Sequence, residues 1–510
     1  MSLLNSAYTL YNRKLLKELD LSSRDPVPFQ EATLRHLLSH GANTLFGETY
    51  KMAEIEDIRA FQERIPLHDY DMLEPYIKQS LKGIENVLWD MPVYWFALSS
   101  GTSSARSKFI PINRENLNSC HYKGMLTMLS NYVRTFPKSR LFMGKSLTLG
   151  GNRHIDKSVD SNCCFGDLSA FLIINTPLIA RFFTTPGKKM GHIPDFEYKI
   201  EKVSRLISGQ NLVSFSGVPS WNLILMRKVL EQSGKKNLHE LWPNMELFMH
   251  GGVCFEPYRV HYKELFPSKN MHYMETYNAS EGFFAFQTDL EDPGLQLLPN
   301  VDVFYEFIPM DKLEAAQNGS YTRFLTLQEV QTDQPYALVI STSSGLWRYL
   351  IGDTIRFTQR NPHKIMITGR TKLFINTFGE ELMIENAERA LARACNLTGA
   401  SVHEYTVAPV YMDGQKKGAH QWLIEFETVP PDPAVFKGIL DRSLMDVNSD
   451  YHAKRLDTGT MDPPQITSMK KGSFYRWLAM NDKLGGQSKV PRLWSNRDYV
   501  EALLEINEKL

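Results

Sequence analysis

A short segment rich in hydroxyl groups carries the clearest sign of chemistry in the chain. It reads LSSGTSSARSK over residues 98–108 and lies between two runs of strand-forming residues. Serine and threonine hydroxyls, backbone N–H groups around a glycine, and a lysine ammonium together supply the many short-range donors that a polyphosphate requires. The spacing differs from the G-x-x-x-x-G-K-[ST] loop, which disfavours a P-loop kinase or GTPase. A serine-rich surface turn is the alternative interpretation, since such turns are common.

A second cluster places an aromatic ring, hydroxyl groups and a carboxylate in one short segment. It reads ETYNASEG over residues 275–282. Mg²⁺ prefers carboxylate and phosphate oxygens, so Glu281 beside a phosphate-binding segment is a candidate metal ligand. A glutamate in a loop is otherwise usually just solvated.

A third cluster ends a strand-like run with a Gly-Asp corner. It reads GLWRYLIGD over residues 345–353. An ionised carboxylate is purely an acceptor, so Asp353 is suited to accept hydrogen bonds from two ribose hydroxyls. The alternative is an aspartate that only caps a turn.

Other residues carry weaker signals. His36 and His40 stand four residues apart on an expected helix, a spacing that can bind zinc. The sequence shows neither an adjacent glutamate nor a third ligand, which disfavours a metal site there. Cys163 and Cys164 are expected to be packing residues, because cysteine is commonly buried as a small apolar side chain.

An expected helix over residues 117–136 follows the first cluster directly. Ser119, His121 and Tyr122 near its start are candidates for the lining of an acyl pocket. A solvated helix face is the favoured interpretation for any one of them.

The elements that must position these clusters alternate between helical and strand-like patterns. Apolar residues recur at helical spacing near residues 34–38 and 117–136. Between and after them stand short runs rich in Val, Ile, Phe and Tyr, over residues 93–98, 108–112, 212–215, 337–341 and 364–368. This alternation predicts an α/β architecture with a large, mostly parallel sheet.

The pattern changes after Gly369. A helix is expected over residues 382–394, and strand-like runs over 405–411 and 421–427 flank a polar turn, which indicates a hairpin. These elements predict a smaller α+β domain at the C-terminal end.

Composition describes a large globular protein without an obvious charged partner. The chain has 510 residues, 43% hydrophobic, with 57 basic and 57 acidic side chains. The balance removes the simplest argument for a nucleic-acid or anionic-membrane partner. The most apolar stretch, residues 168–183, falls short of the ~20 apolar residues that a membrane-spanning helix requires. The N-terminus has no signal-peptide core, and five cysteines without a C-x-x-C pair indicate a reducing compartment, so a cytoplasmic location is expected.

Taken together and in this order, the clusters resemble the motifs of the GH3 family of acyl acid amido synthetases, within the adenylate-forming superfamily. SSGTSSARSKFIPI resembles the family's phosphate-binding motif, YNASEGFFAF its second motif, and YALVISTSSGLWRYLIGDTIRF its third. Flanking matches are VPFQEATLRHLL, IPLHDYDMLEPYI and GRTKLFINTFGEELMIENAE. The resemblance extends over nearly the whole chain and implies a large N-terminal adenylate-forming α/β domain with mixed or parallel sheets and a smaller, mobile C-terminal α+β domain.

The resemblance also implies which residues bind ATP. The nucleotide-binding set would be Ser99, Ser100, Gly101, Thr102, Ser103, Lys108, Gly251, Gly252, Thr276, Tyr277, Ser280, Asp353 and Arg370. In it, the segment 99–103 would hold the β- and γ-phosphates, with Lys108 nearby. Tyr277 would lie against the adenine, and Asp353 with Arg370 would hold the ribose. The glycine pair would let the backbone approach the nucleotide closely.

The implied catalytic residues are Glu281, as the Mg²⁺ ligand, and Lys489. The segment GGQSKVPR, residues 485–492, resembles the family's glycine-bordered lysine loop, which would bring Lys489 to the reacting carboxylate and α-phosphate. Lys372 stands at the position of the superfamily's hinge, which predicts domains over residues 1–371 and 372–510. Two residues depart from the plant pattern: Ala105 replaces a second glycine, and Glu381 replaces a lysine.

The expected function is that of an ATP- and Mg²⁺-dependent ligase that forms a carbon–nitrogen bond. It would convert a carboxylic acid into an acyl-adenylate and pass the acyl group to an amine, with an amino acid as the expected acceptor. No nucleic acid and no membrane is expected as a partner, and the chain should be a monomer or a weak homo-oligomer. The alternatives are an acyl-CoA ligase-like enzyme with a thiol acceptor, and a nucleotide-binding protein that no longer catalyses.

Overall fold

The computed structural model divides the chain into two compact units. The N-terminal unit comprises Met1–Gly101, Arg106–Gly252 and Leu265–Met366, and the C-terminal unit comprises Thr102–Ala105, Val253–Glu264 and Ile367–Leu510. The residues that the structure describes are 3–99, 108–150, 153–154, 163–187, 190, 193, 196–252, 255–371, 374–375, 380, 382–411, 417–457, 461–481, 490–494 and 496–510. The predicted domain boundary between residues 371 and 372 adjoins a position outside these ranges and stays a prediction.

One large sheet organises the N-terminal unit. Within the described ranges its strand order is β12-β13-β14-β15-β11-β10-β9-β8-β7-β3-β6. The strands are β3 (Lys145–Thr148), β6 (Thr184–Thr185), β7 (Leu212–Gly217), β8 (Leu247–Gly251), β9 (His272–Ala279), β10 (Gly282–Gln287), β11 (Leu295–Leu297), β12 (Val303–Pro309), β13 (Pro335–Thr342), β14 (Tyr349–Arg360) and β15 (His363–Arg370).

The sheet is mixed, so the α/β class is confirmed but the expectation of a mostly parallel sheet is wrong. Strands β6, β3, β7, β8 and β9 pair in parallel. The pairs from β9 through β10 and β11 to β15 are antiparallel, and so are the pairs from β12 through β13 to β14. Strand composition indicates that a segment is extended, but it does not indicate the direction of its neighbour.

A second, smaller sheet carries the segments that flank the first motif. Its order is β2-β1-β5-β4, from β1 (Trp95–Ser99), β2 (Lys108–Ile112), β4 (Arg153–His154) and β5 (Cys164–Gly166). Strands β1 and β2 are antiparallel, and Ser99 stands opposite Lys108 in their register. The two ends of the phosphate-binding segment predicted over residues 98–108 are therefore fixed side by side.

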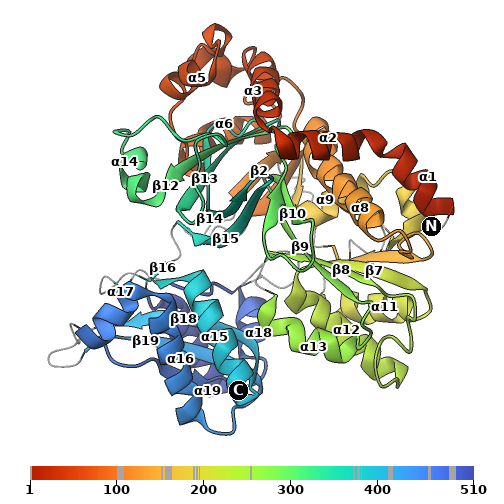
Figure 1. Ribbon diagram of the computed structural model, residues 1–510, viewed down its shortest axis with the longest axis vertical. Coiled ribbons are helices and arrows are strands. Elements are labelled where there is room, and N and C mark those ends of the chain that lie inside the picture. Colours follow the sequence, from red (N-terminus) through yellow and green to blue (C-terminus); the bar gives the residue numbers. More distant parts are fainter. Residues whose placement is uncertain are drawn as a thin grey trace. The chain divides into compact units, whose positions relative to one another are not determined.

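Helices cover these sheets. In the N-terminal unit they are α1 (Leu3–Tyr11), α2 (Arg13–Arg24), α3 (Val27–Gly41), α4 (Leu45–Thr49), α5 (Ile58–Arg64), α6 (Tyr70–Leu81), α7 (Arg114–Asn116), α8 (Lys123–Thr135), α9 (Leu168–Ile174), α11 (Phe196–Ser208), α12 (Pro219–Ser233) and α14 (Leu313–Gln317). Short 3₁₀ or π turns are η1 (Met52–Glu54), η2 (Leu117–Tyr122), η3 (Ala180–Phe183) and η5 (Met310–Lys312). Figure 1 shows α8 above the parallel strands and α11 and α12 below them.

Local sequence explains where several of these helices begin and end. Asp69 accepts a hydrogen bond from the N–H of Met72 and so caps α6. Helix α12 opens with Pro219, whose missing N–H costs nothing at a first helical position, and closes at Gly234 with φ +63°. Such caps place the apolar faces of the helices on a core that is rich in buried aromatic rings, among them Trp89, Trp347, Phe284 and Tyr305.

The C-terminal unit has its own core. Helix α15 (Ile384–Thr398) packs on α16 (Pro433–Val447), and both lie by the three-stranded sheet of β18 (Ser401–Val410), β19 (Ala419–Thr428) and β20 (Gln465–Ser468). Its other elements are α13 (Arg259–Leu265, which continues into the N-terminal unit), η4 (Glu256–Tyr258), β16 (Phe374–Ile375), β17 (Leu382–Met383), α17 (Ser449–His452), η6 (Ala453–Asp457), α18 (Ser473–Met480) and α19 (Asp498–Lys509). Strands β18 and β19 pair antiparallel, which confirms the expected hairpin.

Among the helices that the structure describes, none combines the length and the apolar character needed to cross a bilayer.

Candidate functional site

The second motif forms a tight hairpin between β9 and β10. Gly282 pairs with Ala279, so Ser280 and Glu281 are the two residues of the turn. Both side chains are buried, as are Thr276 and Tyr277 on the strand before them. The expectation that a loop glutamate such as Glu281 is simply solvated is therefore wrong, because the turn lies inside the unit rather than on its surface.

The third motif occupies an irregular stretch of β14. Along β13 the register advances from Ala337 to Val339, while along β14 it runs from Thr354 to Leu350, so the segment 351–353 bulges from the ladder. Gly352 supplies the backbone conformation that this requires, with φ +90°. Bulges redirect side chains and are common beside active sites. Here the bulge sets the direction of Asp353.

The structure brings the second and third motifs into direct contact. The Tyr277 hydroxyl donates a hydrogen bond of 2.6 Å to Oδ2 of Asp353. In the sheet order, β9 and β14 are four steps apart, which would separate them by about 19 Å in a flat sheet with strands ~4.8 Å apart. The contact therefore requires the sheet to curve strongly between β9 and β14.

The lysine of the first motif also meets β14. Nζ of Lys108 lies 3.5 Å from the hydroxyl of Tyr349 and 5.6 Å from the ring centre of Tyr70. Burial raises the pKa of the Tyr70 hydroxyl, which accepts a hydrogen bond from the N–H of Phe109, so the Tyr70 side chain stays neutral beside the ammonium group. All three motifs thus have a described residue on or against β14.

Gly251 lies directly beside the second motif. It pairs with Thr276 across the parallel strands β8 and β9. A Cβ atom at Gly251 would stand 2.5 Å from the backbone oxygen of Thr276 and 2.9 Å from its Oγ1. The next residue, Gly252, has φ +82°. Gly251 is therefore required by the close approach of the two strands and Gly252 by its positive φ, in addition to the predicted role of the pair at the nucleotide.

One residue of the third motif has a structural role that the sequence did not indicate. Arg348 is buried and forms an ion pair of 3.0 Å with Glu306 on β12. Its remaining donors reach the backbone oxygens of Gln62, Ile65 and Thr322. This network holds the chain in place just before β14, three residues before the bulge at residues 351–353.

In the C-terminal unit, the described end of the predicted lysine loop is anchored on β18. Thr406 donates a hydrogen bond of 2.6 Å to the oxygen of Pro491, and the N–H of Val407 donates to the oxygen of Arg492 at 2.9 Å. The guanidinium of Arg492 pairs with Glu404 and donates to the hydroxyl of Tyr258. The segment that follows Lys489 is thus fixed.

Several predicted residues remain predictions. Ser100, Gly101, Thr102, Ser103, Lys372 and Lys489 lie outside the described residues, and of Ser99 the structure describes only the backbone. Arg370 is the last residue of β15 and belongs to the C-terminal unit, so its predicted meeting with Asp353 at a ribose also stays a prediction.

The expectation of a solvated helix face after the first motif is wrong for two of its three residues. His121 and Tyr122 are buried, and the Tyr122 hydroxyl donates to the oxygen of Leu172 at 2.7 Å. Burial lowers the pKa of His121 to about 4. Both residues stand in the π-helical turn η2, and His121 lies four residues after Leu117 and seven before Met128, which are also buried. Cys163 is buried, as expected of a packing residue.

The donor set around β14 fits a nucleotide with its metal ion. It joins a carboxylate suited to hydroxyl donors, an ammonium suited to phosphate, and an aromatic ring, with a buried carboxylate in the neighbouring hairpin turn.

Comparison with known protein families agrees with this arrangement. Profiles of the GH3 family match three successive segments: the N-terminal domain over residues 15–271, the central domain over 296–370 and the C-terminal domain over 385–498. The chain belongs to the GH3 family. The resemblance of the three motifs is thereby confirmed.

Curated GH3 relatives are similar along nearly their whole length. Indole-3-acetic acid-amido synthetase GH3.4 of Arabidopsis thaliana is 23% identical, over 96% of this chain and 93% of that protein. Jasmonoyl--L-amino acid synthetase GH3.5 of Oryza sativa subsp. japonica is also 23% identical, over 94% of each.

Solved structures confirm the adenylate-forming fold. The AtGH3.15 acyl acid amido synthetase in complex with 2,4-DB has a TM-score of 0.79 at 16% identity, covering 97% of this GH3 chain and 96% of that one. A 2-hydroxyisobutyryl-CoA ligase in the postadenylation state has a TM-score of 0.57 at 11% identity, covering 98% and 92%. A large N-terminal domain and a smaller C-terminal domain, as predicted, are common to this fold.

Proposed function

We propose that this GH3 protein is an ATP-dependent acyl acid amido synthetase. It converts a carboxylic acid and ATP into an acyl-adenylate and pyrophosphate. It then transfers the acyl group to an amine, for which an amino acid is the expected acceptor, and releases AMP. The enzyme is accordingly a ligase that forms a carbon–nitrogen bond.

The observation that carries the proposal is the meeting of the three motifs at β14. Tyr277 of the second motif bonds to Asp353 of the third, and Lys108 of the first lies against Tyr349 of the third. Surface turns have no need to contact one another, whereas these three motifs come from separate strands and meet.

Different residues bind different parts of the nucleotide. Asp353 accepts hydrogen bonds from the ribose hydroxyls, and its bond from Tyr277 holds the carboxylate in position for them. Tyr277 also offers its ring to the adenine, with Thr276 and Ser280 beside it. Lys108 donates to phosphate oxygens, as do the hydroxyl groups of the segment 99–103.

Two further residues complete the chemistry. Glu281 holds Mg²⁺, which when bound neutralises charge on the phosphate groups. Lys489 places its ammonium at the reacting carboxylate and the α-phosphate, where it stabilises the charge that develops as pyrophosphate leaves. The preference of carboxylate oxygens for Mg²⁺ and the match of GGQSKVPR to the family's lysine loop support these two roles.

A cytoplasmic location and a monomeric or weakly self-associating chain belong to the same proposal. The four cysteines that the structure describes, Cys120, Cys163, Cys164 and Cys395, all carry free thiols, as a reducing compartment favours.

The test is acid-dependent exchange of pyrophosphate into ATP, measured across a panel of aromatic, indolic and aliphatic carboxylic acids with Mg²⁺. Mixed amino acids or coenzyme A are then added separately, and the products are identified by mass. Exchange followed by an amide supports the proposal. Exchange followed only by a thioester would make the protein an acyl-CoA ligase, and no exchange with any acid would leave a nucleotide-binding protein without turnover.

Two variants with matched controls connect the activity to the assigned residues. Asp353→Asn should weaken ATP binding, whereas Asp333→Asn, at an exposed side chain of the same unit, should not. Lys489→Ala should slow exchange by about 10²- to 10³-fold, the usual cost of losing one charge-stabilising contact. Lys471→Ala, at a side chain that is 81% exposed in the C-terminal unit, is its control. Equal exchange rates in Lys489→Ala and the control would remove Lys489 from the mechanism.

A further inference from the structure

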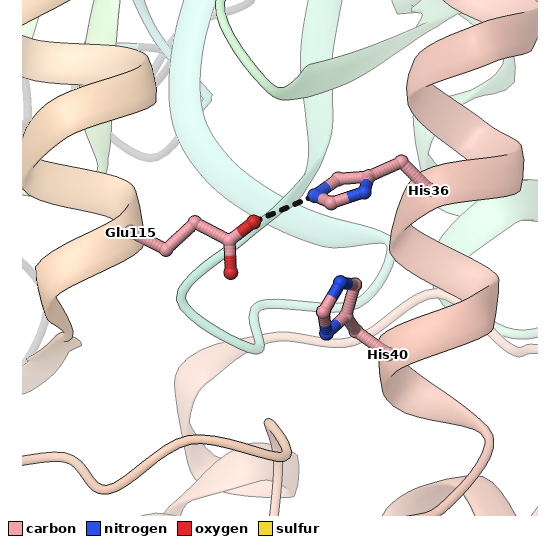
Figure 2. Close-up of side chains that lie close together, drawn as sticks. All are labelled: His36, His40 and Glu115. Carbon is pink, nitrogen blue, oxygen red and sulfur yellow. Dashed lines mark hydrogen bonds and ion pairs between the residues drawn. The ribbon is translucent and has the colours of Figure 1, made fainter.

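Two histidines of α3 and a glutamate of α7 converge in the N-terminal unit. Figure 2 shows the rings of His36 and His40 projecting from one helix toward the carboxylate of Glu115. Nε2 of His36 lies 2.7 Å from Oε1 of Glu115. One possible ligand atom from each of the three residues lies within 4.8 Å of the other two. The third ligand that the sequence lacked is therefore present in space, 79 positions away from His36.

We propose that His36, His40 and Glu115 form a binding site for a divalent transition metal, with Zn²⁺ as the expected ion. The site is independent of the proposed ligase activity, because none of its residues is assigned to ATP or to either substrate. Two imidazoles and one carboxylate are a donor set that suits Zn²⁺, whereas Mg²⁺ and Ca²⁺ require oxygen ligands.

Both elements that carry the ligands are fastened to the same part of the sheet. Gln30 on α3 donates to the oxygens of Pro299 and Val303 and accepts from the N–H of Tyr305. Asn113 caps α7 through the N–H of Asn116 and donates to the oxygen of Ser343. The ligands are thus held by rigid neighbours, which lowers the entropy that metal binding would otherwise lose.

Hydrogen-bond partners outside the three ligands orient the ligand side chains, as in known metal sites. Nδ1 of His40 lies 2.7 Å and 2.9 Å from the two carboxylate oxygens of Asp90, which fixes the proton on Nδ1 and leaves Nε2 as the lone-pair donor. Nε1 of Trp89 donates to Oε2 of Glu115 at 3.0 Å, which leaves Oε1 for the ion. The Trp89 ring also stacks on His40, with ring centres 5.1 Å apart.

Side-chain rotation would bring the ligand atoms to the spacing of an ion, with the His40 atom, within 4.8 Å of the other two, closing by up to about 1.5 Å. In a tetrahedral Zn²⁺ site with bonds of ~2.0–2.1 Å, two ligand atoms stand about 3.3 Å apart. The pair of His36 and Glu115 is now at hydrogen-bond distance and would open by roughly 0.6 Å, which side-chain rotation supplies. The side chains of His36, His40 and Glu115 are 36%, 27% and 13% exposed, so an ion can enter and water can take the fourth position.

The competing explanation is a polar cluster that needs no metal. Each histidine already has a carboxylate partner, Glu115 for His36 and Asp90 for His40. A polar cluster of this kind would not need the two imidazole rings and Glu115 to face one common point, yet they do so in Figure 2, which favours the metal site. With metal bound, α3 would be tied to the segment that leaves β2 and so to the strand that follows the predicted phosphate-binding segment.

The experiment uses the full chain without a histidine tag, without nucleotide, and with Zn²⁺ alone as the ligand. Competition with a chromophoric chelator gives stoichiometry and affinity, and Co²⁺ in place of Zn²⁺ gives the visible spectrum of a tetrahedral site. We expect one equivalent of tightly held metal and a rise in melting temperature on its addition. His36→Gln, His40→Gln and Glu115→Gln should each weaken binding at least about ten-fold. Asp90→Asn should weaken it by about 10- to 100-fold through the lost orientation of His40.

The control variant is His452→Gln, at an exposed histidine of the C-terminal unit, and it should bind Zn²⁺ as the unaltered protein does. Should a ligand variant fail to fold, the unaltered protein still decides, by modification with diethyl pyrocarbonate and mass spectrometry. Protection of His36 and His40 by Zn²⁺, with His452 still modified, supports the site. Equal modification of all three with and without Zn²⁺, or unchanged affinity in the folded His36→Gln variant, would overturn it.

Discussion

The buried arginine of the third motif gives a sharp test of what holds the N-terminal unit together. Arg348 and its partner Glu306 are each 1% exposed. The substitution Arg348→Met keeps most of the side-chain volume but removes the positive charge. It also removes the hydrogen bonds that the guanidinium donates to three backbone oxygens.

The expected loss of stability follows from the Glu306 charge that the substitution leaves unpaired. Removing one partner of a buried ion pair costs ~3–5 kcal/mol, because the other charge is left without compensation. Gln62 still donates to Glu306 at 2.9 Å, but an amide does not neutralise the carboxylate. At about 2 °C per kcal/mol for a unit of this size, the apparent melting temperature should fall by ~6–10 °C.

The assay is scanning calorimetry on the full chain at pH 7, with Arg323→Met as the matched control. Arg323 pairs with Glu329 at 3.1 Å, but its side chain is 80% exposed. Exposed pairs contribute ~0–1 kcal/mol, so this control should change the melting temperature by no more than about 2 °C. The double variant Arg348→Met/Glu306→Leu should recover part of the loss, since no buried charge remains. Equal melting temperatures for the two single arginine variants would refute the reasoning.

Three further outcomes are expected. Gly251→Ala should reduce ATP affinity at least about ten-fold in calorimetric titration, because the new Cβ would stand 2.5 Å from the backbone oxygen of Thr276. The control Gly438→Ala, which has open space around the new Cβ, should leave ATP affinity unchanged. Equal affinities in the two variants would contradict the close packing at Gly251. Tyr277→Phe removes the 2.6 Å hydrogen bond to Asp353; because hydrogen bonds to charged groups contribute ~1.5–3 kcal/mol, ATP affinity should fall roughly ten-fold or more. The control Tyr11→Phe should leave ATP affinity unchanged. An unaffected affinity in Tyr277→Phe would show that the hydroxyl does not orient Asp353. Burial lowers the pKa of His121 to about 4, so as pH falls from about 6.5 toward 4 the unfolded chain takes up a proton that the folded chain does not, and folding stability is lost. In thermal unfolding, the His121→Phe variant should therefore lose about 2 kcal/mol less stability than the unaltered chain between pH 7 and pH 5. Equal losses of stability would contradict a buried neutral ring.

The motifs could be predicted because their chemistry lies in neighbouring residues. Strand β2 has the bounds of the run that the sequence indicated, and the hairpin of β18 and β19 stands where two strand-like runs flank a polar turn. In such segments, local propensity and hydrophobic pattern agree with the final structure.

Contacts between distant segments could not be predicted in this way. Glu115 stands 79 positions from His36, and Glu306 stands 42 positions from Arg348. No spacing rule connects such pairs, since they depend on which strands become neighbours and in which direction. The burial of His121 was missed because the residue is polar: it lies four residues after Leu117 and seven before Met128, both buried, so helical spacing by itself places it on the buried face.

The bond between Tyr277 and Asp353 also bears on how the chain assembles. The two residues are 76 positions apart, and closing a loop of that length costs about 4 kcal/mol of chain entropy. That cost must be met by other contacts, so Asp353 can reach Tyr277 only after the intervening strands have paired. A nascent chain that ends before residue 353 would lack this contact altogether. ATP would therefore stabilise only a completed N-terminal unit, and its binding would report that folding has finished.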